Sequence, residues 1–192
     1  MADAEEGKGG LKPTDSGPDI LAPVFAGTNL SLLDMAKLQA QVLVPVLKAL
    51  RAELGEARAN QLVSTALRGW LHKLYQDIGA QLPGSPRQKW EAINAAVRPR
   101  IGNAIDIERL KQEPDAWEFN IRGCRYADFF RQLGEPELGA VLLCDVDVDI
   151  EAVGNPEVTM TRTQTIMKGA EYCDFRFRMK TGGVQRSESF LS

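Results

Sequence analysis

The sequence predicts an α+β fold in which helices come first and a short antiparallel sheet follows. Three observations support this class. Apolar residues recur at helical spacing through most of residues 31–111, the pattern changes to alternation after Pro114, and residues 157–180 read as a β-hairpin. Helices and antiparallel strands that are segregated along a chain are typical of α+β proteins, so we expect N-terminal helices packed on a short sheet that ends in the hairpin.

The ends of the chain lack these patterns. Residues 1–29 are rich in Gly, Pro, Asp and Ala without periodicity, which predicts a flexible leader, and the polar residues 181–192 predict a flexible tail. Between them, residues 30–180 are expected to form a single α+β domain, since 192 residues is an ordinary length for one domain.

Composition narrows the class of protein. The net charge of −3 gives no electrostatic reason to expect nucleic acid or an anionic membrane as a partner. No apolar run approaches the ~18 residues of a membrane span, and the acidic N-terminus lacks the basic and apolar regions of a signal peptide. We therefore expect a cytoplasmic protein of bacterial type.

The first helix is predicted from Ser31, as N-cap, to Leu54, with Gly55 as its C-terminal cap. Pro45 is expected to kink this helix or to split it in two, because proline lacks the N–H that a helix interior uses. The expected apolar face consists of Leu32, Met35, Leu43, Val46, Leu47, Leu50 and Leu54.

The second helix is the clearest in the sequence, from Glu56 to Ile78, and Gly79 is expected to end it. Its predicted apolar stripe consists of Leu62, Val63, Ala66, Leu67, Trp70, Leu71, Leu74 and Ile78.

A third helix is predicted to begin at Ser85-Pro86, an N-cap followed by proline at the first helical position. Its apolar positions are Trp90, Ile93 and Val97, and it is expected to be disrupted at Pro99 and Gly102. A short helical segment is predicted to resume over Asp106–Lys111.

After Pro114 the elements become short. Alternation predicts a strand over Ala116–Arg122, and two short helices are expected over Tyr126–Leu133 and Pro136–Leu143, the first ended by Gly134. Residues 144–150 alternate acidic and apolar side chains, which fits either a strand or a helix end followed by an extended loop. Residues 154–156 are predicted to form a turn.

The hairpin is predicted to have strands at Val158–Met167 and Tyr172–Met179, with positive φ at Gly169 in the turn over residues 168–171. Side chains on a strand alternate between faces, so the second strand has one apolar and one polar face. The apolar face holds Cys173, Phe175, Phe177 and Met179, and the polar face holds Tyr172, Asp174, Arg176 and Arg178.

The three cysteines, Cys124, Cys144 and Cys173, are the first candidates for chemistry. Their odd number and their spacings of 20 and 29 residues match no zinc pattern, so we expect free thiols in a reducing compartment and no metal. A thiolate is a strong nucleophile when a cation, a base or a helix N-terminus stabilises it. The alternative interpretation is that each is a small buried hydrophobic residue.

Other candidates carry charge. The acidic run Asp145, Asp147, Asp149 and Glu151 fits a general base or a hard-cation site, or else a solvated strand edge. His72 is the only histidine and has mostly polar helical neighbours, which favours a surface position and argues against a Ser-His-Asp triad. Arg162 and Arg176 are expected on the polar faces of the hairpin, where they would clamp a carboxylate or be solvated.

The ordered set of motifs in the last third of the chain resembles the L-2-amino-thiazoline-4-carboxylic acid hydrolase family. The resemblance spans about Trp117–Arg178 and includes all three cysteines. Its segments are Cys124-Arg-Tyr-Ala, Leu133-Gly, Pro136-Glu-Leu-Gly, Leu143-Cys144-Asp-Val-Asp, Asn155-Pro156, Arg162-Thr-Gln-Thr and Gly169-x-x-x-Cys173-Asp-Phe-Arg-Phe. The cysteine layout is also similar to 4-vinyl-reductase-like small-molecule domains, whose fold looks like that of TRAPP-complex subunits.

This resemblance implies a hydrolase-like domain that opens a small cyclic amidine, lactam or imide at a C–N bond, without a cofactor. The type member converts an aminothiazoline carboxylate into N-carbamoyl-cysteine. The expected catalytic residues are Cys173, Cys144, Cys124, Asp145, Asp147 and Asp174, and the expected substrate-binding residues are Arg162, Thr163, Thr165, Tyr126 and Arg176. The partner would be a small-molecule substrate, with self-association left open. The alternatives are a non-catalytic domain that uses the three cysteines to bind a small molecule or a metal, and three structural thiols.

Overall fold

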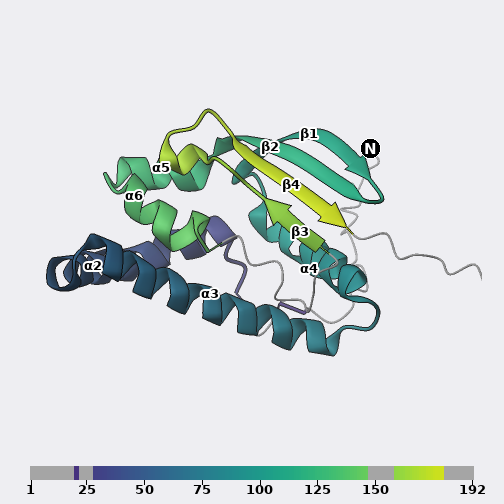
Figure 1. Ribbon diagram of the computed structural model, residues 1–192, viewed down its shortest axis with the longest axis horizontal. Helices are drawn as coiled ribbons and strands as arrows, with labels where there is room; N and C mark the ends of the chain where they lie inside the picture. The colour runs from purple at the N-terminus through teal and green to yellow at the C-terminus, as the bar shows by residue number, and fades with distance from the viewer. Residues whose placement is uncertain (1–19, 22–27, 147–157, 180–192) are drawn as a thin grey trace, which may run out of the picture.

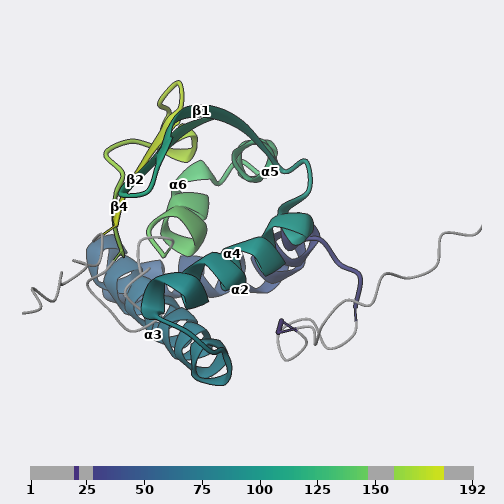
Figure 2. The same ribbon diagram turned by 90° about the vertical axis from the view of Figure 1, so that its right-hand side faces the viewer.

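The computed structural model describes residues 20–21, 28–146 and 158–179. Helices precede a four-stranded antiparallel sheet of order β1-β2-β4-β3, as the order of elements along the sequence predicted, and the α+β class is confirmed. Figure 1 shows the sheet on one side of the molecule and the long helices α2 and α3 on the other. Figures 1 and 2 together show α5 and α6 above α2, beside the end of the sheet at which strand β4 begins.

Helix α2 (Leu32–Leu54) begins and ends where the sequence predicted. Ser31 Oγ accepts a hydrogen bond from the N–H of Asp34 at 3.1 Å, and Gly55 follows the helix with φ of 78°. Of the two outcomes expected at Pro45, a kink or a split, the split does not occur, because the helix continues through this residue. Pro45 and Gln41, whose carbonyl loses its usual partner, are both exposed, and solvent can therefore replace the missing hydrogen bond.

The buried face of α2 differs from the predicted one. It consists of Ala36, Ala40, Val44 and Leu47, whereas Val46 and Leu54, both expected in the core, are exposed. Apolar residues surround this helix on nearly every side, so periodicity alone does not single out the face that packs.

Helix α3 (Glu56–Gln81) follows α2 after the single residue Gly55. It continues past Gly79, which is buried inside its last turn, so the predicted end at that glycine is wrong. Leu62 and Trp70 were predicted in the apolar stripe but are exposed, while Ala59 and Ile78 are buried.

Helix α4 (Pro86–Ile101) has the predicted start. The side chain of Ser85 accepts from the N–H of Gln88, and the Gln88 side chain in turn accepts from the N–H of Ser85, which completes a capping box. Trp90 and Ile93 are buried. The helix continues through Pro99 to Ile101, so the predicted disruption at Pro99 is wrong, whereas Gly102 caps the helix end as expected.

Strand β1 (Ile105–Glu113) replaces the helical segment predicted for Asp106–Lys111, and that prediction is wrong. The strand is mostly exposed on both faces, so it carries no apolar alternation in its sequence. It pairs antiparallel with β2 (Ala116–Cys124), the predicted strand, through a two-residue turn at Pro114 and Asp115.

Two short elements follow β2. Helix α5 (Arg125–Gln132) was predicted, and Gly134 follows it with φ of 77°. Helix α6 (Pro136–Gly139) passes into a π-helical turn, η1 (Ala140–Cys144), in which the N–H of Asp145 donates to the carbonyl of Ala140 at 2.9 Å. The predicted turn at residues 154–156, together with Asp147, Asp149 and Glu151, lies outside the described residues.

The hairpin is present but its first strand is shorter than predicted. Strand β3 (Val158–Thr161) pairs antiparallel with β4 (Cys173–Met179), and a 3₁₀ turn, η3 (Ile166–Lys168), occupies the chain between them. Gly169 has φ of 95°, as the predicted turn required. The alternation of β4 is confirmed, because Cys173, Phe175 and Phe177 are buried.

The core lies between the inner face of the sheet and the helices. Its centre is an aromatic cluster in which neighbouring ring centroids are 4.7–6.4 Å apart, formed by Trp90, Trp117, Phe119, Phe175 and Phe177. In the described part of the chain, none of the helices has the length and apolar character needed to cross a membrane.

Candidate functional site

Cys173 opens strand β4 on the inner face of the sheet and is only 6% exposed. Its Sγ accepts a hydrogen bond from the backbone N–H of Ile166, at 3.2 Å, where the chain enters the turn η3. An N–H group that points at sulfur favours the thiolate over the thiol, because it interacts more strongly with the charged form. The fold thus gives this buried cysteine a donor suited to a nucleophile.

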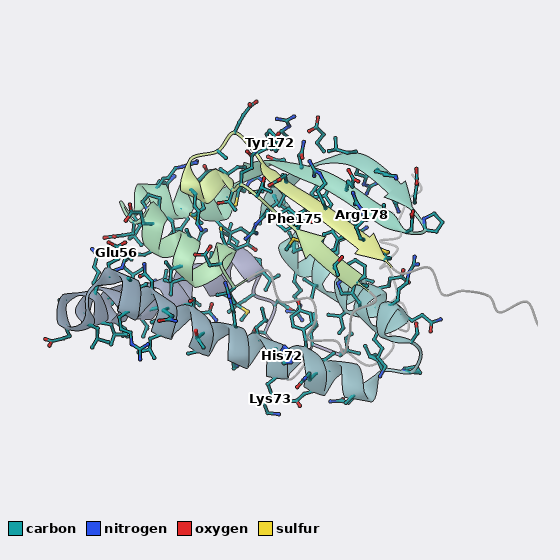
Figure 3. All side chains as sticks on the ribbon, in the orientation of Figure 1. Glu56, His72, Lys73, Tyr172, Phe175 and Arg178 are labelled. Carbon is teal, nitrogen blue, oxygen red and sulfur yellow. The ribbon has the colours of Figure 1, made fainter. Side chains whose placement is uncertain are left out.

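Arg162 does not lie on the polar face of the hairpin, and that prediction is wrong. Its guanidinium carbon is 5.1 Å from the ring centroid of Phe175, which projects from the same face of β4 as Cys173. Its Nη2 also donates to the backbone carbonyl of Cys144. Because β3 ends at Thr161, Arg162 is free of the strand alternation and turns under the sheet. Figure 3 labels Phe175 on strand β4.

Cys144 is the last residue of η1 and is half-buried. The next residue, Asp145, is held by two cations: its carboxylate contacts Lys168 Nζ at 2.6 Å, and its carbonyl accepts from Arg68 Nε at 2.7 Å. The carboxylate predicted as a base is therefore ion-paired next to a cysteine.

Cys124 ends β2 and occupies the N-cap position of α5, and Tyr126 lies in the first turn of that helix. Both are half-buried and pack against the main core. The same hydrophobic cluster includes Cys173, and Cys144 packs at its edge, so the three cysteines belong to one cluster.

Neither of two clefts on the described surface is lined by a cysteine. The larger of the two, of about 550 Å³, is lined by apolar residues such as Val141 and Met167 and by charged residues that include Arg51, Asp145 and Lys168. The second, of about 440 Å³, is almost wholly apolar and lies between α2 and α5. Asp145 connects the larger cleft to Cys144, its neighbour in sequence.

Asp174 lies on the opposite face of β4 from Cys173. Its carboxylate accepts hydrogen bonds from the N–H of Thr163 at 3.0 Å, the hydroxyl of Thr163 at 2.7 Å and the N–H of Gln164 at 2.8 Å. Partial burial acts to raise the pKa of Asp174, but these hydrogen bonds from Thr163 and Gln164 outweigh it and hold that pKa below its usual value. Asp174 and Thr163 thus fix the loop between β3 and η3.

The remaining predicted binding residues have local partners. Thr165 is buried and its hydroxyl accepts from the N–H of Lys168 at 3.2 Å, which caps η3. Arg176, on the outer face, donates to the carbonyls of Phe119 and Phe175 and to Asn120 Oδ1 at 2.9–3.0 Å. Arg162, over the ring of Phe175, and Tyr126, packed against the main core, lie on the side of the sheet that carries Cys173.

Sequence reasoning missed the N–H of Ile166 and the ion pair of Asp145 with Lys168. No sequence motif predicts these two contacts. A backbone donor has no side-chain signature, and the Asp145–Lys168 ion pair joins residues 23 positions apart. His72 lies on α3 and is within 2.8 Å of Gln76 Nε2; Figure 3 shows it in the helical layer across from β4. Within the described residues, no three His, Cys, Asp or Glu side chains gather in a way that would hold a metal ion.

Comparison with known proteins gives a family and distant structural likenesses. The L-2-amino-thiazoline-4-carboxylic acid hydrolase family matches residues 35–177. No curated protein sequence matches the chain. Among solved structures, the phenol-responsive sensory domain of the transcription activator PoxR, bound to phenol, has 14% identity and a TM-score of 0.46, covering 71% of this chain and 72% of its own. A trafficking protein particle complex subunit 3 from Naegleria fowleri, covalently bound to palmitic acid, has 13% identity and a TM-score of 0.41. This match covers 76% of this chain and 97% of that subunit.

Proposed function

The chain belongs to the L-2-amino-thiazoline-4-carboxylic acid hydrolase family, and from this premise we propose that it opens a small cyclic amidine, lactam or imide by hydrolysis. We propose Cys173 as the nucleophile and Arg162 as the group that holds a carboxylate of the substrate. Cys144 is the second candidate for the nucleophile.

One observation carries the choice of Cys173: the N–H of Ile166 points at its sulfur from 3.2 Å. Burial disfavours a thiolate, so a buried nucleophile needs a donor of this kind. The guanidinium of Arg162, over Phe175 on the same face, adds a cation to this side of the sheet.

The chemistry balances without an added cofactor. The thiolate adds to the electrophilic ring carbon, the bond from that carbon to a ring heteroatom breaks, and the leaving heteroatom takes a proton. Water then attacks the covalent intermediate, which releases the opened product and restores the thiol. A lactam or imide would break at C–N. An aminothiazoline that becomes N-carbamoyl-cysteine keeps both nitrogens on the attacked carbon, so its ring bond to sulfur would break instead.

Proton transfer is assigned to Asp145, or to Asp147, which lies outside the described residues. Asp145 follows Cys144 and borders the larger cleft, and its ion pair with Lys168 would supply both a proton acceptor and a proton donor at one place. Asp174 is less suited, because its carboxylate is engaged by Thr163 and Gln164 on the other face.

The test is a set of three matched variants, Cys173→Ser, Cys144→Ser and Cys124→Ser, assayed on cyclic amidines, lactams and imides that carry a carboxylate. We expect Cys173→Ser to melt close to wild type and to lose ring opening by at least ~10³-fold, whereas Cys124→Ser keeps it. Intact-mass measurement during turnover should show one substrate-sized adduct on wild type and none on Cys173→Ser. If Cys144→Ser alone lost activity and adduct, the nucleophile would be Cys144. Three active variants would exclude covalent catalysis by these thiols.

A non-catalytic binding domain is the second candidate function. The deep burial of Cys173 among apolar residues supports it, because a core cysteine needs no chemistry to explain it. It predicts that a carboxylate-bearing ring compound raises the melting temperature of wild type without being opened, and that Cys173→Ser leaves this shift unchanged.

A further inference from the structure

The outward side of helix α2 is apolar and exposed. Leu38, Val42 and Val46 repeat every four residues and are 53%, 63% and 48% exposed. No charged residue occurs from position 38 to position 47, although this helix lies at the surface. A surface helix normally carries charged or polar residues on the face opposite its core face, whereas a helix that is apolar all round is covered on both sides.

Helix α3 carries exposed apolar residues of its own. Leu62, Ala66 and Trp70 form a second exposed stripe at the same four-residue spacing, and α3 packs beside α2 in one hairpin closed by Gly55. Figures 1 and 2 show this hairpin as the layer farthest from the sheet. Large contiguous apolar patches with a charged border usually mark protein–protein contacts.

We propose that this α2–α3 face binds a second copy of the chain in a two-fold dimer, with the two α2 helices antiparallel and crossing at Val42. In that arrangement Leu38 of one copy lies opposite Val46 of the other, and Val42 meets its own symmetry mate. A two-fold interface uses the same patch on both copies, and a stripe centred on one residue satisfies that requirement.

The charges that border the stripe fit the same arrangement. Asp34 and Lys37 form a pair at its N-terminal end, and Lys48 pairs with Glu135 at its C-terminal end. Each pair is neutral within its own chain, so a second copy in either orientation meets no unbalanced charge at the ends of the stripe.

The size of the face suits a stable homodimer. Helix α2 has 23 residues, so it is about 35 Å long, and two helices side by side are about 20 Å wide. The outer face of the two-helix layer is therefore about 700 Å², close to the ~800 Å² per partner of a standard interface. An apolar centre without charge is typical of homodimers.

The first test measures the mass of the full chain in solution by light scattering and sedimentation. We expect a dimer for wild type and a monomer with unchanged circular dichroism for Val42→Asp. Leu110→Asp is the matched control, since Leu110 is 50% exposed on strand β1 and outside this face, and it should remain a dimer. A wild-type chain that is monomeric at roughly 100 µM would overturn the proposal, and so would a dimeric Val42→Asp.

The second test determines the geometry of the dimer by oxidative cross-linking of introduced cysteines. Wild type is the control for any links that the three native thiols form. Val42→Cys should link to its own copy. Leu38→Cys alone should not, but a mixture of Leu38→Cys with Val46→Cys should form the mixed dimer. Self-linking of Leu38→Cys would indicate parallel helices and overturn the antiparallel arrangement. If the Val42→Cys variant were monomeric and its new thiol were protected from oxidation, another segment of the same chain would cover the stripe. This result too would overturn the dimer.

Discussion

Arg162 donates a hydrogen bond to the main-chain carbonyl of Cys144, and this bond joins the hairpin loop to the end of the π-helical turn. The same guanidinium lies over the ring of Phe175. A planar, always-charged group is thus held beneath the sheet, on the side where Cys173 begins β4. Guanidinium groups recognise carboxylates by two parallel N–H donors, which a lysine does not offer.

Arg162→Lys keeps the charge and removes this planar fork. We expect KM for a carboxylate-bearing ring substrate to rise at least ~10-fold while kcat changes less, because binding of the carboxylate is lost in ground and transition state alike. Steady-state kinetics measure both constants. Arg176→Lys is the control, since Arg176 bonds carbonyls on the outer face, and its KM should stay within ~2-fold of wild type. Equal effects of the two substitutions would contradict the assignment.

Asp174→Asn should destabilise the fold in a pH-dependent way. The pKa of Asp174 in the folded chain is held below the ordinary 3.8, so its stabilising contribution is complete above that pH and is lost as the pH falls through the folded pKa. The side chain is only partly buried, so we expect a loss of only ~1 kcal/mol at neutral pH, or about 2–4 °C in Tm.

Thermal melts of wild type and Asp174→Asn between neutral pH and about pH 2 check this, because the difference should disappear at the acid end. Asp128→Asn is the control: Asp128 makes only an exposed contact with Arg131, at 3.5 Å, among the contacts described. It should change the melting temperature little at any pH. Ring-opening activity should survive Asp174→Asn, and its loss would restore Asp174 as a candidate base.

Gly139→Ala should be costly although Gly139 has ordinary helical angles. A Cβ at this position would lie 2.5 Å from Phe130 Cγ and 2.9 Å from Met167 Sδ, and Phe130 is among the most buried side chains. Overpacking of this kind costs about 1–3 kcal/mol, which chemical denaturation measures. Glu137→Ala, in the same short helix and 80% exposed in its side chain, should stay within ~0.5 kcal/mol of wild type. A neutral Gly139→Ala would show that α6 shifts freely against η3.

Protein purified without chelator should contain no stoichiometric zinc or other transition metal. The sequence has one histidine and no CxxC pair, and the described residues bring no three metal-binding side chains together. Elemental analysis checks this, with a chelator-treated sample as the reference for melting temperature and activity. About one zinc per chain, lost with activity on chelation, would favour the metal-binding alternative instead.

The sequence predicted the elements whose patterns have local causes. Helix starts at Ser31 and Ser85 follow from capping chemistry, and the faces of β4 follow from strict alternation. Strand β1 was missed because it is an edge strand, exposed on both faces and rich in residues that also suit helices, and pairing with β2 decides its conformation.

The candidate site was only half predictable. Cys173 was placed correctly on the inner face, because the period of β4 determines it. Arg162 was placed on the wrong face, because alternation was extended past Thr161, where the strand ends. The donor to Cys173 belongs to the backbone of a turn that only the packed hairpin creates, and sequence patterns do not encode such long-range placement.

The strand order has a consequence for how the chain folds. Strands β1 and β2 are joined by two residues, whereas β2 and β4 become neighbours only after residues 125–172 are enclosed. Closing so long a segment costs chain entropy before any contact repays it. The β1–β2 hairpin should therefore be structured in the folding transition state and β4 should dock late. A core truncation such as Phe177→Leu would then speed unfolding while leaving the refolding rate nearly unchanged, and a slower refolding rate would instead place β4 in the nucleus.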